Sequence, residues 1–256
     1  MTVLDLFRLD GKVALVTGAS RGLGQGMAVG LAEAGADIAG LDRTPDCNET
    51  CAQVEVLGRR YFNLSIDLLN ATPEDLTRAV EQVVERLGRI DILVNNAGII
   101  RRAPALDYTV ADWDEVININ LRALFFLSQA AGRVMAAQGS GKIINVASML
   151  SFQGGILVPS YTASKSAVAG LTRALANEWA PLGVNVNAIA PGYMATDNTA
   201  PLRADPVRSE AILARIPAGD WGTPDDLKGA VVYLASDAAR YVHGAILPVD
   251  GGWLAR

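Results

Sequence analysis

Histidine and cysteine are almost absent from this chain. His243 is the only histidine among 256 residues, and Cys47 and Cys51 are the only cysteines. A single histidine excludes a polyhistidine metal site, and no second pair of cysteines or histidines is present to complete a zinc site or a disulfide framework. We therefore expect no metal, two cysteines that are ordinary residues of a helix, and proton chemistry carried by side chains other than histidine.

Long apolar runs and an excess of one charge are also missing. No uninterrupted apolar segment approaches the length of a bilayer span, and the opening MTVLDLFRLDGK lacks the pattern of a signal peptide. The 22 basic and 27 acidic residues are interspersed and give a net charge of −5, which argues against a nucleic-acid groove or an anionic membrane surface. We expect a cytoplasmic protein that acts on a small molecule, with no nucleic-acid or membrane partner.

The chain contains many short apolar runs, separated by segments of helical length. Hydrophobic residues make up 50% of it, enough for a sizeable core. The runs are rich in Val, Ile and Leu without strict alternation, which is typical of parallel strands covered on both faces. The predicted strands are Val13–Thr17, Asp37–Leu41, Tyr61–Ile66, Ile90–Val94, Lys142–Ala147, Val184–Ile189 and Ala245–Val249. The pattern predicts one α/β domain over residues 1–256, a Rossmann-type doubly wound parallel seven-stranded sheet with helices on both faces.

Helices are predicted between these strands, where apolar residues recur at helical spacing. The predicted helices are Gly24–Ala34, Pro73–Leu87, Ala111–Ala136, Tyr161–Ala180 and Pro224–Ser236, the last preceded by Thr223 as a candidate cap. The region Tyr193–Trp221, rich in Pro, Arg and Asp, breaks this rhythm. We expect it to form a loop-and-helix insertion over the active site, serving as a substrate lid.

A glycine-rich turn, TGASRGLG over residues 17–24, follows the first predicted strand and precedes the first helix. Because glycine has no Cβ, such a turn can tighten and bring backbone N–H groups and a helix N-terminus to a pyrophosphate. Glycine-rich turns occur in many folds, and it is the strand before and the helix after this one that favour dinucleotide binding.

Asp42 follows the second predicted strand, where an acidic side chain can accept hydrogen bonds from the adenosine ribose hydroxyls. A carboxylate ~4 Å from a 2′-phosphate would cost on the order of 4 kcal/mol at an effective dielectric constant of roughly 20. This favours NAD(H) over NADP(H). Arg21 and Arg43 lie beside these elements and could instead bind a 2′-phosphate, which is the alternative that favours NADP(H). The structural alternative for Asp42 is that it is a solvated turn residue.

Polar and small residues also follow the third and fourth strands. Asp67 and Leu68 come at the end of the third, and Asn95–Gly98 (NNAG) at the end of the fourth, so both segments border the crevice expected at the strand ends. Asp67 fits contact with the adenine amino group and, nearly as well, a helix cap or a turn. The NNAG segment can hold strand geometry and line the cofactor at once.

Tyr161 and Lys165 lie four positions apart in a predicted helix, which puts both side chains on one face. The ammonium group can then stabilise the phenolate, lower the pKa of the tyrosine and make it a usable acid near neutral pH. Such a pair is common by itself, but Ser148 at the end of the fifth predicted strand makes the set specific. Tyrosine and lysine thus replace the missing histidine.

These motifs resemble the classical branch of the short-chain dehydrogenase/reductase family. The resemblance covers essentially the whole chain and rests on TGASRGLG, NNAG, Asn120 within residues 116–121, Ser148, YTASK over residues 161–165, and Pro191-Gly192. It implies a catalytic tetrad of Asn120, Ser148, Tyr161 and Lys165.

The resemblance also implies how the tetrad works. Tyr161 donates a proton to the substrate carbonyl oxygen as hydride arrives from the nicotinamide, or accepts one during oxidation, and Ser148 positions that oxygen. Lys165 holds the nicotinamide ribose and lowers the pKa of the tyrosine, while Asn120 anchors a water that connects Lys165 to solvent. The segment PGYMAT, residues 191–196, would clamp the nicotinamide carboxamide through the Met194 backbone and the Thr196 hydroxyl.

The cofactor-binding residues expected on these grounds come from the strand ends, the turn and the catalytic helix. They are Gly18, Ser20, Arg21, Gly22, Leu23, Gly24, Asp42, Asp67, Leu68, Asn95, Ala97, Gly98, Tyr161, Lys165, Pro191, Gly192, Met194 and Thr196.

Longer stretches, among them NNAGIIRR, KIINVASMLSFQGG, NVNAIAPGYMAT and VDGGWLAR, resemble a narrower group of the family that acts on deoxy sugar acids. This group comprises the 2-deoxy-D-gluconate 3-dehydrogenases and the 2-dehydro-3-deoxy-D-gluconate 5-dehydrogenases. The resemblance implies NADH-dependent reduction of a 2,5-dioxo-3-deoxygluconate in the bacterial breakdown of pectin-derived uronates, and a homotetramer.

A sugar-acid substrate requires a cation for its carboxylate. Arg101 and Arg102 directly follow the fourth predicted strand and its NNAG segment, near the mouth of the crevice. A solvated arginine pair is the equally weighted alternative. Gln153 and Tyr193 are further candidates for binding substrate hydroxyls.

Two other functions fit parts of the pattern. A gluconate 5-dehydrogenase or a 3-oxoacyl carrier-protein reductase would share the fold and the tetrad, so only substrate profiling separates them. A cofactor-sensing binding protein would keep the nucleotide site but would be expected to lack Tyr161 or Lys165, and both are present.

Overall fold

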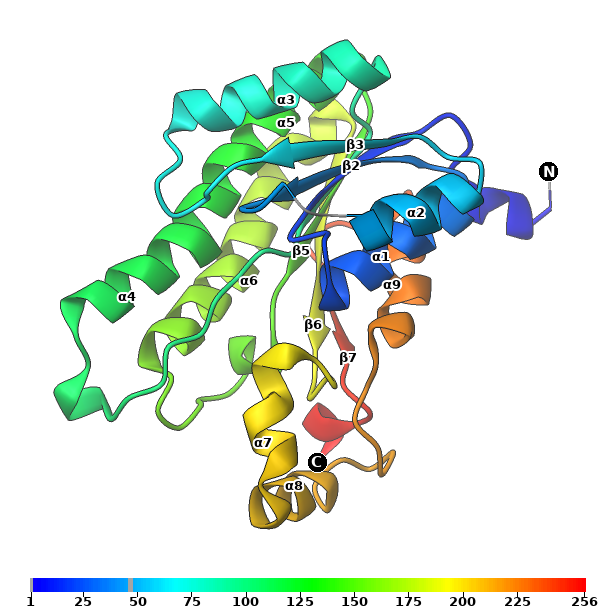
Figure 1. Ribbon diagram of the computed structural model, residues 1–256. Helices are drawn as coiled ribbons and strands as arrows, with labels where there is room; N and C mark the ends of the chain where they lie inside the picture. The colour runs from blue at the N-terminus through cyan, green and yellow to red at the C-terminus, as the bar shows by residue number, and fades with distance from the viewer. Residues whose placement is uncertain (1, 46–47) are drawn as a thin grey trace.

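The computed structural model of the chain describes residues 2–45 and 48–256. It contains one parallel sheet in the order β3-β2-β1-β4-β5-β6-β7, with helices packed on both faces (Figure 1). The strands are β1 (Val13–Thr17), β2 (Asp37–Asp42), β3 (Tyr61–Ser65), β4 (Ile92–Asn95), β5 (Gly141–Val146), β6 (Val184–Pro191) and β7 (Ile246–Val249). The predicted doubly wound fold is confirmed. The strand order reverses between β1 and β4, so the crevice for a ligand lies at the carboxyl ends of these strands.

The helices connect successive strands. They are α1 (Gly22–Glu33), α2 (Asn48–Val56), α3 (Pro73–Leu87), α4 (Val110–Ile117), α5 (Leu124–Gln138), α6 (Pro159–Trp179), α7 (Ala200–Ala204), α8 (Pro206–Leu213) and α9 (Lys228–Ala235). Cys51 lies in α2, as predicted, and Cys47 lies outside the described residues. No helix in the described ranges is long and apolar enough to cross a membrane.

The apolar core lies in two layers, one on each face of the sheet. Successive residues of a strand point to opposite faces, so Leu15 belongs to the layer under α3 and α5, whereas Val16 belongs to the layer under α1 and α9. Both side chains are fully buried. This two-sided burial is why the strand sequences are almost continuously apolar.

Two predicted helices differ from the structure. The segment predicted as one helix, Ala111–Ala136, is divided by a π-helix (Asn118–Ala123) between α4 and α5. The segment Pro224–Ser236 begins as a 3₁₀ turn (Pro224–Leu227) and only then continues as α9. The π-helix carries Asn120, and such one-turn irregularities are common at functional sites.

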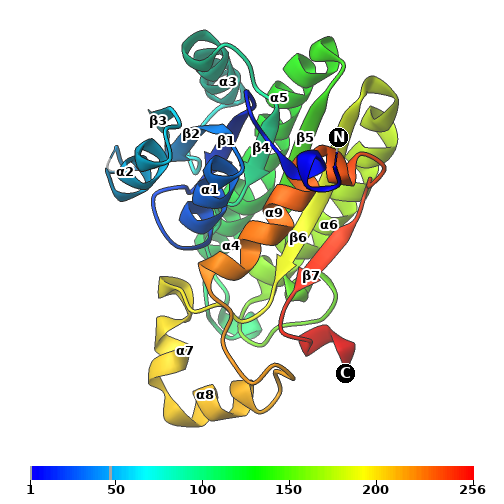
Figure 2. The same ribbon diagram turned by 90° about the vertical axis from the view of Figure 1, so that its right-hand side faces the viewer.

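The insertion between β6 and α9 contains a 3₁₀ turn (Asp197–Thr199), α7 and α8. These elements project beyond the carboxyl ends of the strands, away from the sheet, in both ribbon views (Figures 1 and 2). Ile212 and Ile216 of the insertion pack in an apolar cluster with Met149, which follows β5, and Trp253, which follows β7. The region Tyr193–Trp221 therefore contains helices, as predicted, and lies at the strand ends.

Candidate active site

The glycine-rich turn lies at the carboxyl end of β1 and opens α1. Gly18 and Gly22 have left-handed φ angles of 67° and 59°. A Cβ atom at Gly24 would lie 1.9 Å from the carbonyl oxygen of Gly18, so no other residue fits there. The predicted residues Ser20, Arg21 and Leu23 lie between these glycines. Gly22 and Leu23 at the N-terminus of α1 are half-buried, so this end of the helix fits the pyrophosphate of a dinucleotide cofactor.

Asn96 shapes this turn from the neighbouring strand end, a role that the sequence analysis did not assign. Its amide Nδ2 donates to the carbonyl oxygens of Thr17 (2.9 Å) and Gly18 (3.2 Å). The hydroxyl of Thr17 accepts hydrogen bonds from the backbone N–H groups of Asn96 (3.0 Å) and Ala97 (2.9 Å). The NNAG motif was the available signal, because it places an amide beside the turn.

Asp42 lies at the end of β2 and is bound to the same turn. Its carboxylate accepts hydrogen bonds from the backbone N–H groups of Ala19 (3.1 Å) and Ser20 (3.3 Å) and from the Ser20 hydroxyl (2.9 Å). The residue is buried. Asp42 is therefore a fixed part of the crevice wall and not a solvated turn residue, whereas Arg43 beside it is exposed.

Two other predicted cofactor residues use their side chains within the protein. The carboxylate of Asp67 accepts from the Leu69 backbone N–H (3.1 Å) and the Asn70 amide (2.9 Å), which is the turn role left open above. The amide of Asn95 donates to the Ser128 hydroxyl and to the Asn145 side-chain oxygen, both at 2.9 Å. Asn95 thus links β4 to β5 and α5, and its side chain is buried beneath the crevice.

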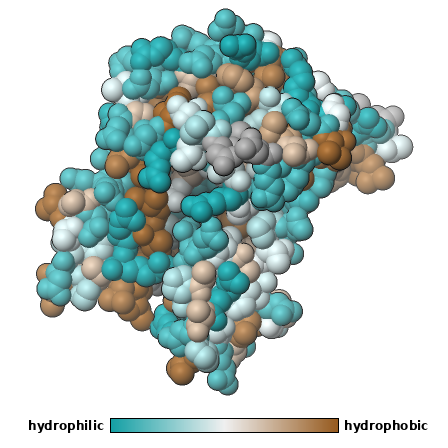
Figure 3. Space-filling model, in the orientation of Figure 1, coloured by the Kyte–Doolittle hydropathy of each residue, from teal (hydrophilic) through white to brown (hydrophobic). Residues whose placement is uncertain are grey.

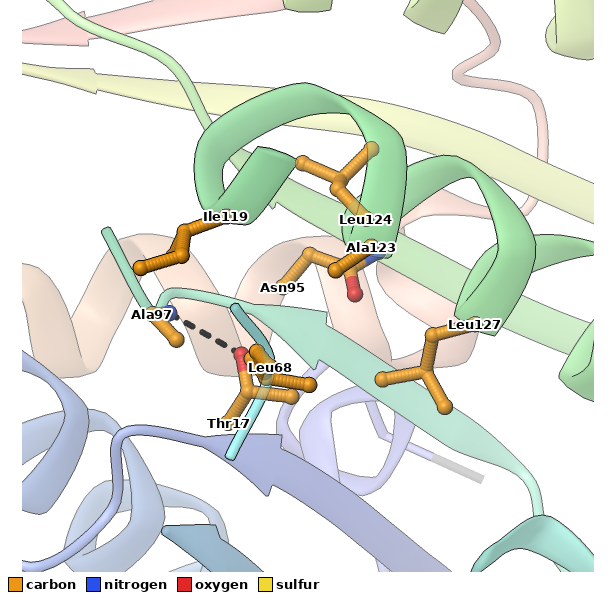
Figure 4. A pocket seen from close by; sticks show the side chains of 8 residues that line it. All are labelled: Thr17, Leu68, Asn95, Ala97, Ile119, Ala123, Leu124 and Leu127. Atoms are coloured by element: carbon orange, nitrogen blue, oxygen red, sulfur yellow. Dashed lines mark hydrogen bonds between the residues drawn. The ribbon is translucent and has the colours of Figure 1, made fainter. Parts of the chain in front are cut away.

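A cavity of about 10 Å³ lies among the ends of β1 and β4, the π-helix and α5 (Figure 4). Its lining residues are Thr17, Leu68, Asn95, Ala97, Ile119, Ala123, Leu124 and Leu127. This volume is far too small for a sugar acid. The cavity therefore lies among the residues that form the cofactor crevice, and it is not the substrate site.

Asn120 holds the segment that follows β4. Its Oδ1 accepts from the backbone N–H of Ile99 (2.9 Å), and its Nδ2 donates to the carbonyl oxygen of Ile99 (3.0 Å) and to the Ser164 hydroxyl (3.2 Å). A Cβ at Gly98 would lie 3.2 Å from Asn120 Oδ1 and 3.7 Å from Lys165 Nζ. The structure therefore brings the NNAG segment, Asn120 and Lys165 together.

Tyr161 and Lys165 share one face of α6, as predicted. The Lys165 Nζ atom lies 5.7 Å from the centre of the Tyr161 ring and donates a 2.6 Å hydrogen bond to the carbonyl oxygen of Val146 at the end of β5. Ser148 follows the same strand. Ser151 joins the two segments, because its hydroxyl accepts from the Ser148 backbone N–H (3.3 Å) and donates to the Lys165 carbonyl oxygen (2.6 Å).

The pKa values of this group follow its burial. Burial raises the pKa of Tyr161, while a hydrogen bond with Ser148 and the positive charge of Arg102 act in the opposite direction. Burial lowers the pKa of Lys165 to about 8. The lowering of the Tyr161 pKa predicted from Lys165 is not found in the cofactor-free chain, because desolvation of the phenolate is the larger effect.

The two adjacent arginines have different partners. Arg101 donates to the Glu115 carboxylate at 3.0 and 2.7 Å, and the Asp112 carboxylate lies 3.6 Å away. The charge of Arg101 is therefore paired with carboxylates of the protein itself. Arg102 acts electrostatically on Tyr161 and donates a hydrogen bond to the carbonyl oxygen of Asn198 (3.3 Å). Of the two, Arg102 is the cation whose charge lowers the pKa of Tyr161.

The segment after β6 lies over the glycine-rich turn. A Cβ at Gly22 would lie 3.9 Å from the Thr196 methyl group, and Arg21 forms a 3.0 Å ion pair with Asp197. Met194 is buried, and its carbonyl oxygen accepts hydrogen bonds from the Thr196 N–H (3.0 Å) and the Thr199 hydroxyl (2.5 Å). The turn and this segment therefore border the crevice from two sides. Pro191 and Gly192, also predicted to contact the cofactor, connect β6 to this segment.

The remaining substrate candidates contact the insertion. Gln153 accepts a weak hydrogen bond from Arg215 (3.5 Å). The Tyr193 ring packs edge-on against Trp221 and Trp253, with ring centres 5.5 and 4.8 Å apart. These contacts place both residues on the insertion side of the site, where they support its shape.

Comparisons with known proteins show which family this chain resembles. A family model described as enoyl-(acyl carrier protein) reductase matches residues 18–254. A 2-dehydro-3-deoxy-D-gluconate 5-dehydrogenase from Escherichia coli (strain K12) is 60% identical, over 99% of this chain and 100% of the relative.

Two solved structures are also closely similar. A protein from Agrobacterium tumefaciens, described as a candidate 2-deoxy-D-gluconate 3-dehydrogenase with bound NADP, is 55% identical with a TM-score of 0.91, over 98% of this chain and 100% of that one. A gluconate 5-dehydrogenase from Burkholderia cenocepacia J2315, in complex with NADP and tartrate, is 40% identical with a TM-score of 0.95, over 100% of both chains. This chain therefore belongs to the short-chain dehydrogenase/reductase family and is an oxidoreductase that uses a nicotinamide cofactor.

Proposed function

We propose that this enzyme interconverts a keto and a hydroxyl group on a deoxy sugar acid, as a 2-dehydro-3-deoxy-D-gluconate 5-dehydrogenase or a 2-deoxy-D-gluconate 3-dehydrogenase does. The observation that carries the proposal is the guanidinium of Arg102, whose charge acts on the phenol of Tyr161. A substrate whose carbonyl oxygen lies at Tyr161 then has a cation within reach of its carboxylate. The 60% identity to the Escherichia coli enzyme supports the same substrate class.

In the proposed reaction, Tyr161 is the proton donor and Ser148 positions the carbonyl oxygen. A raised pKa keeps the Tyr161 phenol protonated, which is the form that reduction requires. The nicotinamide supplies the hydride when bound. The hydroxyl proton of Tyr161 goes to the carbonyl oxygen, the new C–H and O–H bonds give the alcohol, and the phenolate regains its proton through the Lys165 ammonium. Oxidation reverses these steps.

Asn120 and Lys165 position the segments and the cofactor around Tyr161. Asn120 bonds both the N–H and the carbonyl oxygen of Ile99, which holds the NNAG segment beside the cofactor crevice. Lys165 is anchored to β5 by its bond to Val146 and is buried, so its ammonium has a fixed position from which to bind the nicotinamide ribose. The water that Asn120 anchors, and the clamp formed by Met194 and Thr196, complete the proposed site.

We propose that NAD(H) is preferred over NADP(H). The fixed carboxylate of Asp42 supports this preference, because it repels a 2′-phosphate and can accept bonds from ribose hydroxyls. Arg21, the cation within the turn, is paired with Asp197. The NADP bound in two similar structures supports the opposite preference, in which Arg21 and Arg43 hold the phosphate.

We also propose that residues 193–221 serve as a substrate lid and that the enzyme is a cytoplasmic homotetramer active in the breakdown of pectin-derived uronates. Self-association is supported by apolar side chains at the α4 end of the molecule, where Leu106 is fully exposed and Val110 and Trp113 are 76% and 41% exposed. Apolar surface gathers there in the space-filling view (Figure 3). Sedimentation equilibrium tests the tetramer, which a monomer at micromolar concentration would contradict.

The function is tested by measuring kcat/KM for a panel of carbonyl substrates with NADH and NADPH. The panel contains a 2,5-dioxo-3-deoxygluconate, 5-keto-D-gluconate and an acetoacetyl thioester. We expect the deoxy keto acid to give the highest kcat/KM. A preference for 5-keto-D-gluconate would identify a gluconate 5-dehydrogenase, and a preference for the thioester would identify a 3-oxoacyl reductase. Cofactor binding without turnover of any of them would support a sensing protein.

A further inference from the structure

The segment that carries Arg102 is attached to the start of the catalytic helix by two hydrogen bonds. The backbone N–H of Ala103 donates to the carbonyl oxygen of Leu157 (3.0 Å). Five residues later, the hydroxyl of Tyr108 lies 2.6 Å from the hydroxyl of Ser160. Ser160 is fully buried in the first turn of α6 and directly precedes Tyr161. The carboxylate-binding candidate and the proton donor are thus joined through Tyr108.

The direction of these bonds follows from counting hydrogens. The Tyr108 hydroxyl also lies 3.2 Å from the backbone carbonyl oxygen of Arg101, which can only accept. A phenol has one hydrogen, so Tyr108 donates it to Arg101 and accepts the hydroxyl hydrogen of Ser160. Tyr108 therefore holds both the backbone just before Arg102 and the residue just before Tyr161.

The loop on the other side of this junction is strained. Leu157 has a φ of 65°, and it is the one non-glycine residue in the described part of the chain with a positive φ. Its side chain is 47% exposed, so burial of that side chain does not hold the conformation. Backbone strain of this kind persists where surrounding contacts impose it, and here the carbonyl of Leu157 is the acceptor for Ala103. The bond between Ala103 and Leu157 therefore persists although it requires a strained backbone at Leu157.

We propose that Tyr108 is a positioning residue for substrate recognition: its hydroxyl joins the backbone of Arg101 to Ser160 and so sets the distance between the Arg102 guanidinium and Tyr161. The inference rests on the proposed role of Arg102. The Arg102 side chain is exposed, and it donates a 3.3 Å hydrogen bond to the carbonyl oxygen of Asn198 on the insertion. Its position therefore depends on the backbone that Tyr108 holds, and a loosened backbone weakens a bond to the substrate carboxylate more than it weakens proton transfer.

The test compares Tyr108→Phe with Tyr241→Phe, which removes a hydroxyl from a tyrosine that is 90% exposed. Each variant is assayed with the preferred keto acid and with the neutral methyl ester of the same acid. Loss of one net hydrogen bond corresponds to about a 2- to 10-fold effect. We expect Tyr108→Phe to lower kcat/KM for the acid by this factor, chiefly through KM, and to leave the ester and the affinity for NADH unchanged. Tyr241→Phe should match the wild type with both substrates.

A double-mutant cycle with Arg102→Ala separates positioning from a merely structural role. On the Arg102→Ala background, Tyr108→Phe should cause no further loss. Ser160→Ala, which removes the other partner of the Tyr108 hydroxyl, should reproduce the acid-specific loss and provides a second variant if Tyr108→Phe unfolds. An equal loss for acid and ester, an undiminished loss on the Arg102→Ala background, or no loss would overturn the inference. If Arg102→Ala itself spares the acid, the proposed role of Arg102 fails first and the inference fails with it.

Discussion

Burial raises the pKa of Tyr161, and the guanidinium of Arg102 opposes that rise. Arg102 lies in the loop after β4, whereas Tyr161 lies in the first turn of α6. Arg101, the neighbour of Arg102 in sequence, is paired with Glu115 instead. Of the two adjacent arginines, Arg102 is therefore the one whose charge acts on Tyr161.

Tyr161→Phe should abolish turnover and preserve cofactor binding. The substitution deletes the transferable proton and leaves the glycine-rich turn, Asp42 and Lys165 in place. General acid catalysis contributes roughly 10²- to 10⁴-fold, so kcat should fall by about that factor while the Kd for NADH, measured by fluorescence titration, stays within about twofold. Retention of more than about a tenth of wild-type kcat would remove Tyr161 from the role of acid.

Arg102→Ala should impair the enzyme selectively for acid substrates. A hydrogen bond to a charged group contributes about 1.5–3 kcal/mol, so kcat/KM for the acid should fall roughly 10- to 150-fold while that for its methyl ester changes little. Arg101→Ala is the matched control, because its exposed ion pair with Glu115 stabilises the fold by only about 0–1 kcal/mol. A larger acid-specific loss in Arg101→Ala would reverse the assignment, and no loss in either variant would direct attention to Arg215, which stacks on Trp253 at 4.0 Å.

The cofactor prediction concerns Asp42. Wild-type enzyme should have a higher kcat/KM with NADH than with NADPH, because the carboxylate repels the 2′-phosphate. Asp42→Asn keeps one oxygen that can accept from Ser20 but removes the charge and the acceptor for the Ala19 N–H, so it should reduce the preference for NADH over NADPH. Asp42→Ala should narrow it as well and also weaken both cofactors, since the turn loses its acceptor. A wild-type preference for NADPH would mean that Arg21 and Arg43 dominate.

Much of the fold follows from local sequence, and the reasons are visible in single elements. Helix α3 begins and ends where it is predicted because Thr72 and Asp75 form a capping box at its start and Gly88, with a φ of 94°, ends it. The π-helix at Asn118–Ala123 was missed because the apolar pattern runs through it unchanged. The π-helix carries Asn120, whose bond partner Ile99 lies 21 positions away in the sequence, so a local pattern does not show it.

The catalytic residues of the candidate site could be predicted from the sequence, but the partners of the two arginines could not. Motif spacing places Ser148, Tyr161 and Lys165 together, and the structure brings them to one end of the sheet. Nothing in the order of residues distinguishes Arg101 from Arg102, because the choice depends on Glu115 lying one helix later and meeting only the first of the two. The direction of the Tyr161 pKa shift was likewise hidden, since it depends on how much water the folded chain removes from the phenol.

Lys165 should make the stability of the cofactor-free protein depend on pH. Burial lowers the pKa of Lys165 from its ordinary value of 10.5 to about 8. Between these values the unfolded chain binds a proton that the folded chain does not, so the contribution of Lys165 to the free energy of unfolding rises with pH. Below pH 8 the folded protein carries the buried charge at a cost on the order of 3 kcal/mol. The hydrogen bond from Nζ to the carbonyl oxygen of Val146 separately stabilises the folded state by about 1 kcal/mol, and a variant without the amine loses it.

Replacing the lysine tests this directly, because Lys165→Met keeps the apolar stem and removes the charge. At pH 7 the variant should be more stable than the wild type by about 2 kcal/mol, and the advantage should disappear as the pH approaches 10. The measurement is denaturant unfolding of both proteins without cofactor at several pH values. Comparing the difference between the proteins cancels the opposite contribution of Tyr161, whose raised pKa lowers stability at high pH in both. A difference that stays constant with pH would mean that Lys165 keeps an ordinary pKa in the folded chain, and a less stable variant at every pH would mean that its hydrogen bond to β5 outweighs its desolvation.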